Sequence, residues 1–213
     1  MEQISTQTDL IPDEILIRQI LDGEQKAFEY IMRRYNQRLY RTGMSILTDD
    51  MEVEEAMQTT YINAYEHLGK FEGRSSVGTW LTRIMINECL ARKKNGMKAK
   101  KESVPISETT ASRDTPVHIL ANKELSTVLE KAVSQLPDKY RLVFVLREIE
   151  DMSVKETSHT LSIEESNVKT RLNRAKNMLR DSLSGYMKDH VYSFHLRRCD
   201  RIVNNVFAHL HLQ

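Results

Sequence analysis

The stretch SVKETSHTLSIEESNVKTRLNRAKNMLR, from Ser153 to Arg180, predicts a short helix, a tight turn and a longer helix. Glu156 follows Ser153 at the spacing of a capping box, which begins a helix. Small and apolar residues recur at helical spacing along one side of both helices, and Ile163 fills the turn between them. Ser162 stands where such turns often have glycine. The stretch therefore predicts a helix-turn-helix.

The opposite face of the second helix is basic and polar. Arg and Lys contact phosphates or guanine, Asn can recognise adenine, and Thr can contact either, so this mixture suits a recognition helix in the major groove. The predicted DNA contacts are Asn167, Lys169, Thr170, Arg171, Asn173 and Arg174. A helical hairpin with a solvated basic face is the alternative interpretation.

The composition limits what the rest of the chain can be. Of 213 residues, 40% are hydrophobic and 29% are charged, and the formal net charge is +1, so bulk charge alone does not predict nucleic-acid binding. Only 7 Gly and 4 Pro favour long helices over many turns, and 2 Cys exclude a disulfide framework. The sequence has no signal-peptide pattern and no apolar run of about 18 residues, so we expect a cytoplasmic protein without membrane insertion.

Apolar periodicity predicts an all-α fold of two small helical domains joined by a flexible linker, with a C-terminal helical tail. The first domain comprises residues 1–94, with helices near 13–21, 24–47, 50–68 and 77–94. Residues 95–120 carry prolines, Ser, Thr and charge without apolar periodicity, which is typical of a linker. The second domain, residues 121–183, contains the helix-turn-helix, and Pro137 and Asp138 are expected to end one helix and cap the next.

The tail, residues 184–213, carries an apolar stripe that predicts an amphipathic helix packed on the second domain or on a partner. His195 and Cys199 are four residues apart, a spacing that could place two metal ligands on one face. No second close pair completes a ligand set, so structural packing is the preferred interpretation and no metal or other cofactor is expected.

Several motifs occur together in one order across the linker. The stretches AFEYIMRRYNQRLYRTG, VEEAMQTTYINAYEHLGKF, VGTWLTRIMINECLARKK and LPDKYRLVFVLREIEDMSVKE precede LSIEESNVKTRLNRAKNMLR. From about Asp13 to Leu183 the chain resembles bacterial sigma factors of the extracytoplasmic-function type. The resemblance implies a subunit that directs RNA polymerase core to promoters. Its second domain would bind the upstream minus-thirty-five element as duplex, and its first would bind the minus-ten element and initiate melting.

The resemblance also implies residue roles in the first domain. The minus-ten element would be contacted by the loop after Phe71 and the helix that follows it, through Arg74, Ser75, Ser76, Thr79, Trp80, Arg83 and Asn87. Trp80 is in register with Leu81 and Ile84, so its preferred interpretation is a core anchor. The polymerase clamp would be contacted by Glu54, Glu55 and Gln58; alternatively, the glutamates only favour the positive end of their helix.

The sequence contains no Gly-rich phosphate loop, no HExxH motif and no convincing nucleophile and base, so an enzyme is not expected. The expected partners are bacterial RNA polymerase core, promoter DNA in duplex and single-stranded form, and an anti-sigma factor. The alternative function is a regulator that uses the helix-turn-helix without polymerase, with the first domain as a sensor or dimerisation module. The polar loop before TWL and RIMIN favours the sigma-factor interpretation, since a sensor domain would not require it.

Overall fold

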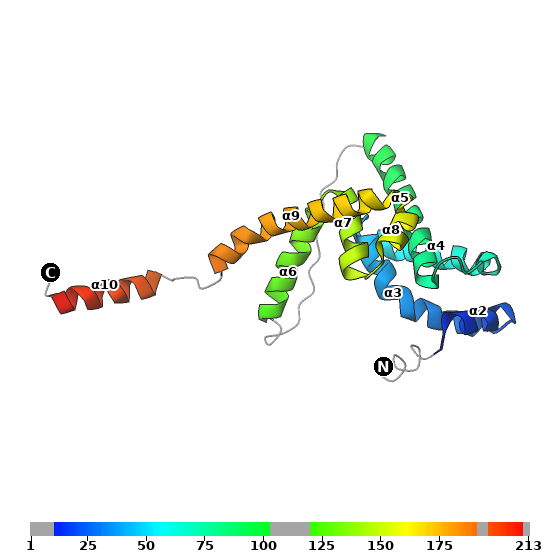
Figure 1. The fold of residues 1–213 in the computed structure, drawn as a ribbon, viewed down its shortest axis with the longest axis horizontal. Helices are drawn as coiled ribbons and strands as arrows, with labels where there is room; N and C mark the ends of the chain where they lie inside the picture. The colour runs from blue at the N-terminus through cyan, green and yellow to red at the C-terminus, as the bar shows by residue number, and fades with distance from the viewer. Residues whose placement is uncertain (1–10, 103–119, 191–195, 211–213) are drawn as a thin grey trace.

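The computed structural model describes residues 11–102, 120–190 and 196–210, and these are entirely helical and turn structure without a strand (Figure 1). The first domain contains α2 (Asp13–Leu21), α3 (Phe28–Met44), α4 (Asp50–Glu66) and α5 (Val77–Glu102). The second contains α6 (Leu120–Ser134), α7 (Asp138–Phe144), a π-helical turn η4 (Val145–Ile149), α8 (Val154–Leu161) and α9 (Glu165–His190). The tail contains α10 (Leu196–Leu210). The predicted all-α class is confirmed, although α5 and α9 extend beyond the expected domain ends.

Three helices of the first domain, α3, α4 and α5, form its core. Leu39, Val53, Ala56, Leu81 and Met85 are fully buried among them. The side chain of Asp49 accepts a hydrogen bond from the backbone N–H of Glu52 and so begins α4, as the sequence predicted. This core holds α4 and α5 side by side, which orients the exposed faces that carry the first domain's predicted contacts.

Gly43 lies where α3 crosses α4 and α5. A Cβ built there would lie 2.6 Å from Met85 Cε and 2.8 Å from Val53 Cγ1, and both side chains are buried. Gly43→Ala should therefore lower the free energy of unfolding by about 1–3 kcal/mol, since overpacking outweighs the roughly 1 kcal/mol of helix propensity that alanine gains.

Urea unfolding followed by circular dichroism measures this change. Gly96→Ala, where nothing lies within 4 Å of the added Cβ, is the matched control on a helix. A Gly43→Ala protein as stable as the wild type would mean that the crossing can widen at no cost.

The helix-turn-helix begins with the predicted capping box. Ser153 Oγ accepts a hydrogen bond from the Glu156 backbone N–H at 3.1 Å, and a Glu156 carboxylate oxygen accepts one from the Ser153 N–H at 2.8 Å. Ser162 ends α8 in the left-handed conformation at φ 52°, which confirms the turn without the usual glycine. Val168, Ala175 and Leu179 form the buried side of α9, as predicted.

One expectation at the start of α7 is wrong. The helix begins at Asp138 with Pro137 as its N-cap residue, and no side-chain cap bond is formed there. Asp138 is the first helical residue, and its carboxylate instead accepts hydrogen bonds from Arg141 and Lys93. Proline before the first turn and a carboxylate within it both favour a helix start, so α7 still begins where the sequence placed it.

The two domains pack against each other rather than lying apart. Leu142, Leu146 and Met152 of the second domain belong to the same buried cluster as the core of the first. Helix α8 packs against α5, and the π-helical turn packs against α3. Figure 1 shows α8 beside α5.

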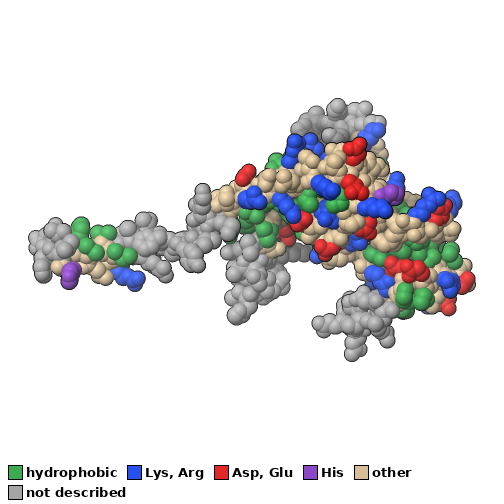
Figure 2. All heavy atoms as spheres, viewed as in Figure 1, with side chains coloured by type: hydrophobic (Ala, Val, Ile, Leu, Met, Phe, Trp, Pro, Cys, Tyr) green, Lys and Arg blue, Asp and Glu red, His purple; other side chains and the backbone are tan. Residues whose placement is uncertain are grey.

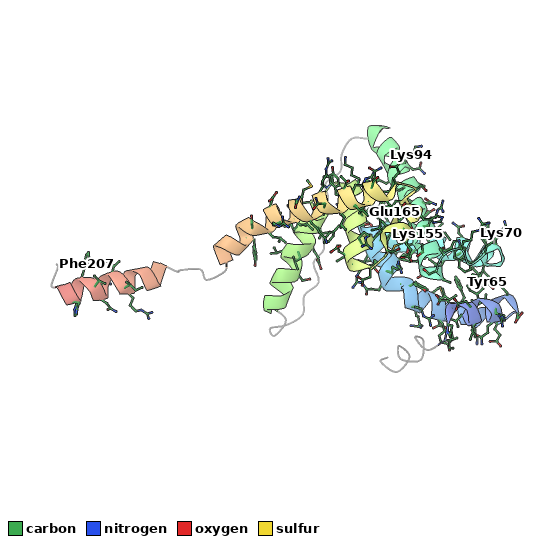
Figure 3. The ribbon with its side chains drawn as sticks, viewed as in Figure 1. Tyr65, Lys70, Lys94, Lys155, Glu165 and Phe207 are labelled. Atoms are coloured by element: carbon green, nitrogen blue, oxygen red, sulfur yellow. The ribbon has the colours of Figure 1, made fainter. Side chains whose placement is uncertain are left out.

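The predicted tail helix is present as α10, but the expected covering of its apolar stripe is not seen. Ile202, Val203, Val206 and Phe207 are 41–50% exposed. Figure 3 shows Phe207 on a helix that stands apart from the two packed domains. Among the described residues, no helix combines the length and apolar character needed to cross a membrane.

Candidate nucleic-acid interface

The exposed side of α9 carries the predicted recognition residues. Asn167, Lys169, Thr170, Asn173 and Arg174 are exposed, whereas Arg171 is half-buried. The Thr170 hydroxyl donates to the Ser166 carbonyl at 2.9 Å, so its oxygen can only accept from outside, and its methyl group offers an apolar contact. Figure 2 shows Lys and Arg side chains along this face of the molecule with acidic side chains between them. The helix thus presents donors that match base edges and phosphates, on a rigid support.

Sequence reasoning missed a neighbour of this face on α7. The Arg174 guanidinium donates to the Tyr140 hydroxyl at 3.3 Å, and Lys139 Nζ lies 5.0 Å from the centre of the Tyr140 ring. The hydrogen bond from Arg174 lowers the pKa of Tyr140, because a cation favours the phenolate. Tyr140 thus restrains one recognition side chain, which the linear sequence does not reveal, since the two residues are 34 positions apart.

The loop before α5 is built as a helix start. Ser76 Oγ accepts a hydrogen bond from the Thr79 backbone N–H at 3.2 Å, so it satisfies a free donor of the first turn. Arg74 forms an ion pair with Glu72 and is largely exposed. Gly73 has φ +67°, a conformation that favours glycine. The loop therefore exposes Arg74 and Ser76, although Ser76 is also bonded to the first turn of α5, and it leaves Ser75 half-buried.

On α5, Trp80, Arg83 and Asn87 are spaced for one side of the helix. Arg83 and Asn87 are exposed, and Trp80 is half-buried with its ring centre 5.1 Å from that of Phe71. Trp80 packs against the core cluster, which agrees with its interpretation as an anchor, but it keeps part of its ring accessible. Together these three residues present one cation, one amide and a partly exposed indole to solvent.

Thr79 does not join that surface. It is buried, and its hydroxyl donates to a carboxylate oxygen of Glu156 at 3.2 Å. Hydrogen bonds from Ser153, supplemented by that from Thr79, hold the pKa of Glu156 below its ordinary value. The carboxylate is therefore ionised near neutral pH and accepts hydrogen bonds from both domains.

A groove of about 580 Å³ lies between α3 and α4 and includes two of the predicted clamp residues. Glu54 and Gln58 line it together with Met57 and Tyr61, and α3 contributes Glu29, Met32, Arg33 and Asn36. Glu55 does not line the groove, and its carboxylate accepts a hydrogen bond from Arg92 at 2.8 Å. Sequence reasoning missed the α3 residues, although the polar residues Glu29, Arg33 and Asn36 recur at helical spacing and are exposed, which could have been the signal.

Metal ligation finds no support in the described part of the chain, where no group of three or more His, Cys, Asp or Glu side chains could hold an ion. His195 and the side chain of Cys199 lie outside the described residues. Cys89 is buried, and burial raises the pKa of its thiol to about 12, so it stays protonated and unreactive.

A capped helix-turn-helix with an exposed polar recognition face, packed beside a second helical domain, defines a DNA-binding protein of transcription. Models of two families match the chain in that order: sigma-70 region 2 over residues 31–97 and sigma-70 region 4 over residues 126–179. The chain belongs to the extracytoplasmic-function (ECF) sigma factors of bacterial RNA polymerase.

Curated relatives match most of the chain. The ECF RNA polymerase sigma factor SigW of Bacillus subtilis is 31% identical over 176 residues, which cover 78% of this chain and 94% of that protein. The RNA polymerase sigma-H factor of Pseudomonas aeruginosa is 25% identical over 190 residues, covering 83% and 96%. The ECF RNA polymerase sigma-E factor of Escherichia coli K12 is 25% identical over 182 residues, covering 79% and 93%.

Two solved structures share the fold. The sigma factor RpoE of Bartonella quintana, crystallised with the anti-sigma factor NepR, aligns with a TM-score of 0.62 at 20% identity, covering 75% of this chain and 98% of that one. CnrH, solved with the cytosolic domain of CnrY, aligns with a TM-score of 0.58 at 24% identity, covering 81% and 97%.

Proposed function

We propose that this sigma factor divides promoter recognition between its domains, with α9 contacting the minus-thirty-five element. The carrying observation is the exposed row on α9, in which Lys169, Asn173 and Arg174 point away from a fully buried seam at Val168 and Ala175. A helix in the major groove needs this separation, because the buried side fixes its orientation while the polar side contacts bases. Asn167, Thr170 and Arg171 complete the proposed contact set.

The first domain is proposed to capture the minus-ten element through Arg74, Ser75, Trp80, Arg83 and Asn87. A base removed from the stack needs an apolar or aromatic surface and polar groups that recognise its edge. Trp80 with Phe71 offers the former, and the exposed side chains around it offer the latter. Ser76 and Thr79 belong to the same proposed element; in this structure Ser76 is exposed and hydrogen-bonded to Thr79, and Thr79 is buried.

The groove between α3 and α4 is the proposed docking site for the polymerase clamp. Its floor is apolar at Met57 and Tyr61, and Glu54 and Gln58 lie at its polar edge. Glu55 is proposed as a further contact from outside the groove. An anti-sigma factor is the expected regulatory partner, as it is for RpoE of Bartonella quintana by its description. The protein would act in the cytoplasm, where core polymerase meets DNA.

Transcription with purified components tests this function. Core polymerase plus this protein should transcribe from promoters that core polymerase alone does not transcribe. The protein alone should bind the same DNA weakly, because its two short contact surfaces must be fixed at one spacing before both can bind. The competing hypothesis is a regulator that acts without polymerase. Tight, promoter-specific binding by the free protein, with no stimulation of core polymerase, would favour that regulator.

Replacing Asn87 by alanine, or Arg74, Ser75 and Ser76 together by alanine, should impair promoter opening more than assembly on the promoter. We expect about a tenfold loss of transcription from duplex templates, equivalent to about 1.4 kcal/mol. Permanganate footprinting on duplex and pre-melted templates measures the opening step. Lys70→Ala, an exposed change in the same domain, is the control. Failure of pre-melted DNA to restore activity would contradict a role in melting or base capture.

A further inference from the structure

The tail helix α10 carries an inference that goes beyond promoter recognition and does not depend on it. We propose that α10 binds this protein peripherally to membrane surfaces that contain anionic phospholipid. Its apolar side would enter the lipid, and its arginines would contact the phosphates of the headgroups. The proposal rests on how side chains are distributed around this helix, on its length and on its charge.

Apolar and polar side chains lie on opposite sides of α10. Figure 2 shows the described apolar side chains of the tail helix on one side, and its Arg and His side chains on the other. At 3.6 residues per turn, the apolar positions fall within an arc of about 140°. These positions are Leu196, Cys199, Ile202, Val203, Val206, Phe207 and Leu210. An apolar surface of this kind that stays in water marks a binding site.

The helix needs a surface in order to be stable. It has 15 residues, close to the length below which an isolated helix is only marginally stable in water. Much of it consists of Val, Ile, Asn and Asp, which favour a helix only weakly. Phe207 lies on a helix that stands apart from the two packed domains, so they do not supply that surface (Figure 3). The stabilising surface is therefore sought outside them.

The charge of α10 indicates what that surface is. Helical spacing places Arg197, Arg198 and Arg201 outside the apolar arc. With Asp200 they give the helix a formal charge of +2, whereas the whole chain of 213 residues carries only +1. A guanidinium pairs well with phosphate oxygens, and basic side chains beside a membrane are attracted to anionic lipid. An anionic lipid surface thus complements both sides of the helix.

The length of α10 decides how it would lie. At a rise of 1.5 Å per residue the helix is about 22 Å long, whereas the hydrocarbon core of a bilayer is about 30 Å thick. A short helix with separated apolar and basic sides lies in the plane of the interface, with its apolar side about 5–10 Å deep. The proposed binding is therefore peripheral, which agrees with the finding that no described helix could cross a membrane.

A second copy of the chain fits α10 less well. Its 15 residues make about two heptads, whereas a coiled coil needs at least about three. The apolar arc is also wider than the narrow seam of a coiled coil, so pairing would leave part of it in water. Two copies would in addition bring like charges together. A lipid surface is therefore the favoured partner, and a second copy or an acidic protein groove would be distinguished by experiment.

Lipid binding would leave the other proposed surfaces free. The recognition residues are on α9, and the groove proposed for the polymerase clamp lies between α3 and α4. Neither surface includes a residue of α10. The membrane would therefore hold a pool of this sigma factor in equilibrium with the free protein, and polymerase would draw on that pool by mass action.

Vesicle flotation with the full-length protein tests the apolar side. Vesicles of phosphatidylcholine with phosphatidylglycerol, at about three to one, should bind it at least about tenfold more tightly than phosphatidylcholine alone. Ile202→Gln with Phe207→Gln should weaken this binding at least about tenfold, since glutamine keeps the helix propensity but removes apolar surface. Met51→Gln with Ile62→Gln makes the same change at exposed positions of α4 and should bind like the wild type. Equal binding by all three proteins would overturn the proposal.

The same assay tests the arginines. Replacing Arg197, Arg198 and Arg201 together with glutamine should reduce binding to anionic vesicles to the level seen with phosphatidylcholine alone. The control replaces Arg18, Lys70 and Lys94, which are exposed cations of the first domain, with glutamine (Lys70 and Lys94 are labelled in Figure 3). It should retain the preference for anionic vesicles. An equal loss in both triple variants would show that overall charge, not α10, attracts the protein.

Tryptophan fluorescence tests the orientation of α10 on the vesicle. Phe207→Trp should shift its emission to shorter wavelength on anionic vesicles, and brominated phosphatidylcholine should quench it. Asn204→Trp, on the polar side of the same helix, should show neither effect. The unmodified protein gives the background from Trp80. Equal responses of the two tryptophans would overturn the proposed insertion of one side.

Light scattering after size-exclusion chromatography separates the other partners. The wild type and the Ile202→Gln, Phe207→Gln variant should both be monomers, with equal helix content by circular dichroism. A wild-type dimer that this variant dissociates, without vesicle binding, would overturn the proposal in favour of a second copy. A monomer that binds neither kind of vesicle would overturn it as well and would leave an acidic protein groove as the partner.

Discussion

Replacing Lys169 and Arg174 together with alanine should reduce promoter-specific transcription at least about 30-fold. Both side chains are exposed on α9, and Arg174 is restrained there by its hydrogen bond to the Tyr140 hydroxyl. Loss of a base contact in the major groove costs about 1–3 kcal/mol. The two lie five positions apart on the helix, so the losses are expected to add approximately and to reach at least 2 kcal/mol. Run-off transcription with core polymerase, together with binding of the holoenzyme to a promoter fragment, measures the effect.

The matched control is Arg180→Ala, which removes an exposed cation from the same helix beyond the proposed contact set. It should leave transcription within about twofold of the wild type. Salt dependence separates phosphate contacts from base contacts. Loss of a phosphate contact weakens binding to all DNA sequences alike and lowers the slope of log binding constant against log salt concentration by about one. Loss of a base contact instead relaxes specificity at one position of the promoter. Unchanged transcription in the double variant would exclude α9 as the recognition helix.

Arg141→Met should lower the free energy of unfolding by about 3 kcal/mol, although methionine fills much of the same space. The substitution removes three charge-assisted hydrogen bonds and leaves the Ser45 and Ser134 carbonyls without that partner. Each hydrogen bond to a charged group contributes about 1.5–3 kcal/mol, and gains from an apolar side chain offset part of the loss. Urea unfolding followed by circular dichroism measures the change.

Arg141→Lys should recover only part of this stability, because a single ammonium group cannot match the planar fork that satisfies three acceptors. Lys131→Met, an exposed position on α6, is the control and should change stability by less than about 0.5 kcal/mol.

The domains should also unfold in two separate transitions once Arg141 no longer joins them. A single unchanged transition in Arg141→Met would show that the guanidinium neither stabilises nor couples the domains.

The features that could be predicted from sequence are those whose partners lie nearby in the chain. The capping box of Ser153 and Glu156 and the cap at Asp49 are local, and the buried side of α9 follows from helical periodicity. The outward row of recognition residues follows from the same periodicity, because whatever is not buried on a packed helix faces solvent.

The contact between the domains could not be predicted in this way, because its partners are far apart in the sequence. The acceptor of Arg141 Nε is a backbone carbonyl 96 positions away, and a carbonyl has no identity in the sequence. Arg141 therefore looked like an ordinary charged residue within an apolar run. Thr79 was assigned to the minus-ten set by resemblance, and the linear sequence could not show that its hydroxyl would be engaged by Glu156. Tyr140 was missed for the same reason, since its partner Arg174 is distant in the chain.

Glu156 serves two structural elements through its two oxygens: one accepts from Ser153 at the start of α8, and the other accepts from Thr79 of the first domain. This sharing constrains the engineering of hybrid regulators. A chimera that joins the first domain of this chain to a foreign helix-turn-helix keeps Thr79 but loses its acceptor unless the donor protein has a carboxylate at the third position of that helix. Designers of orthogonal gene circuits should therefore exchange positions 79 and 156 as a pair, together with the capping serine.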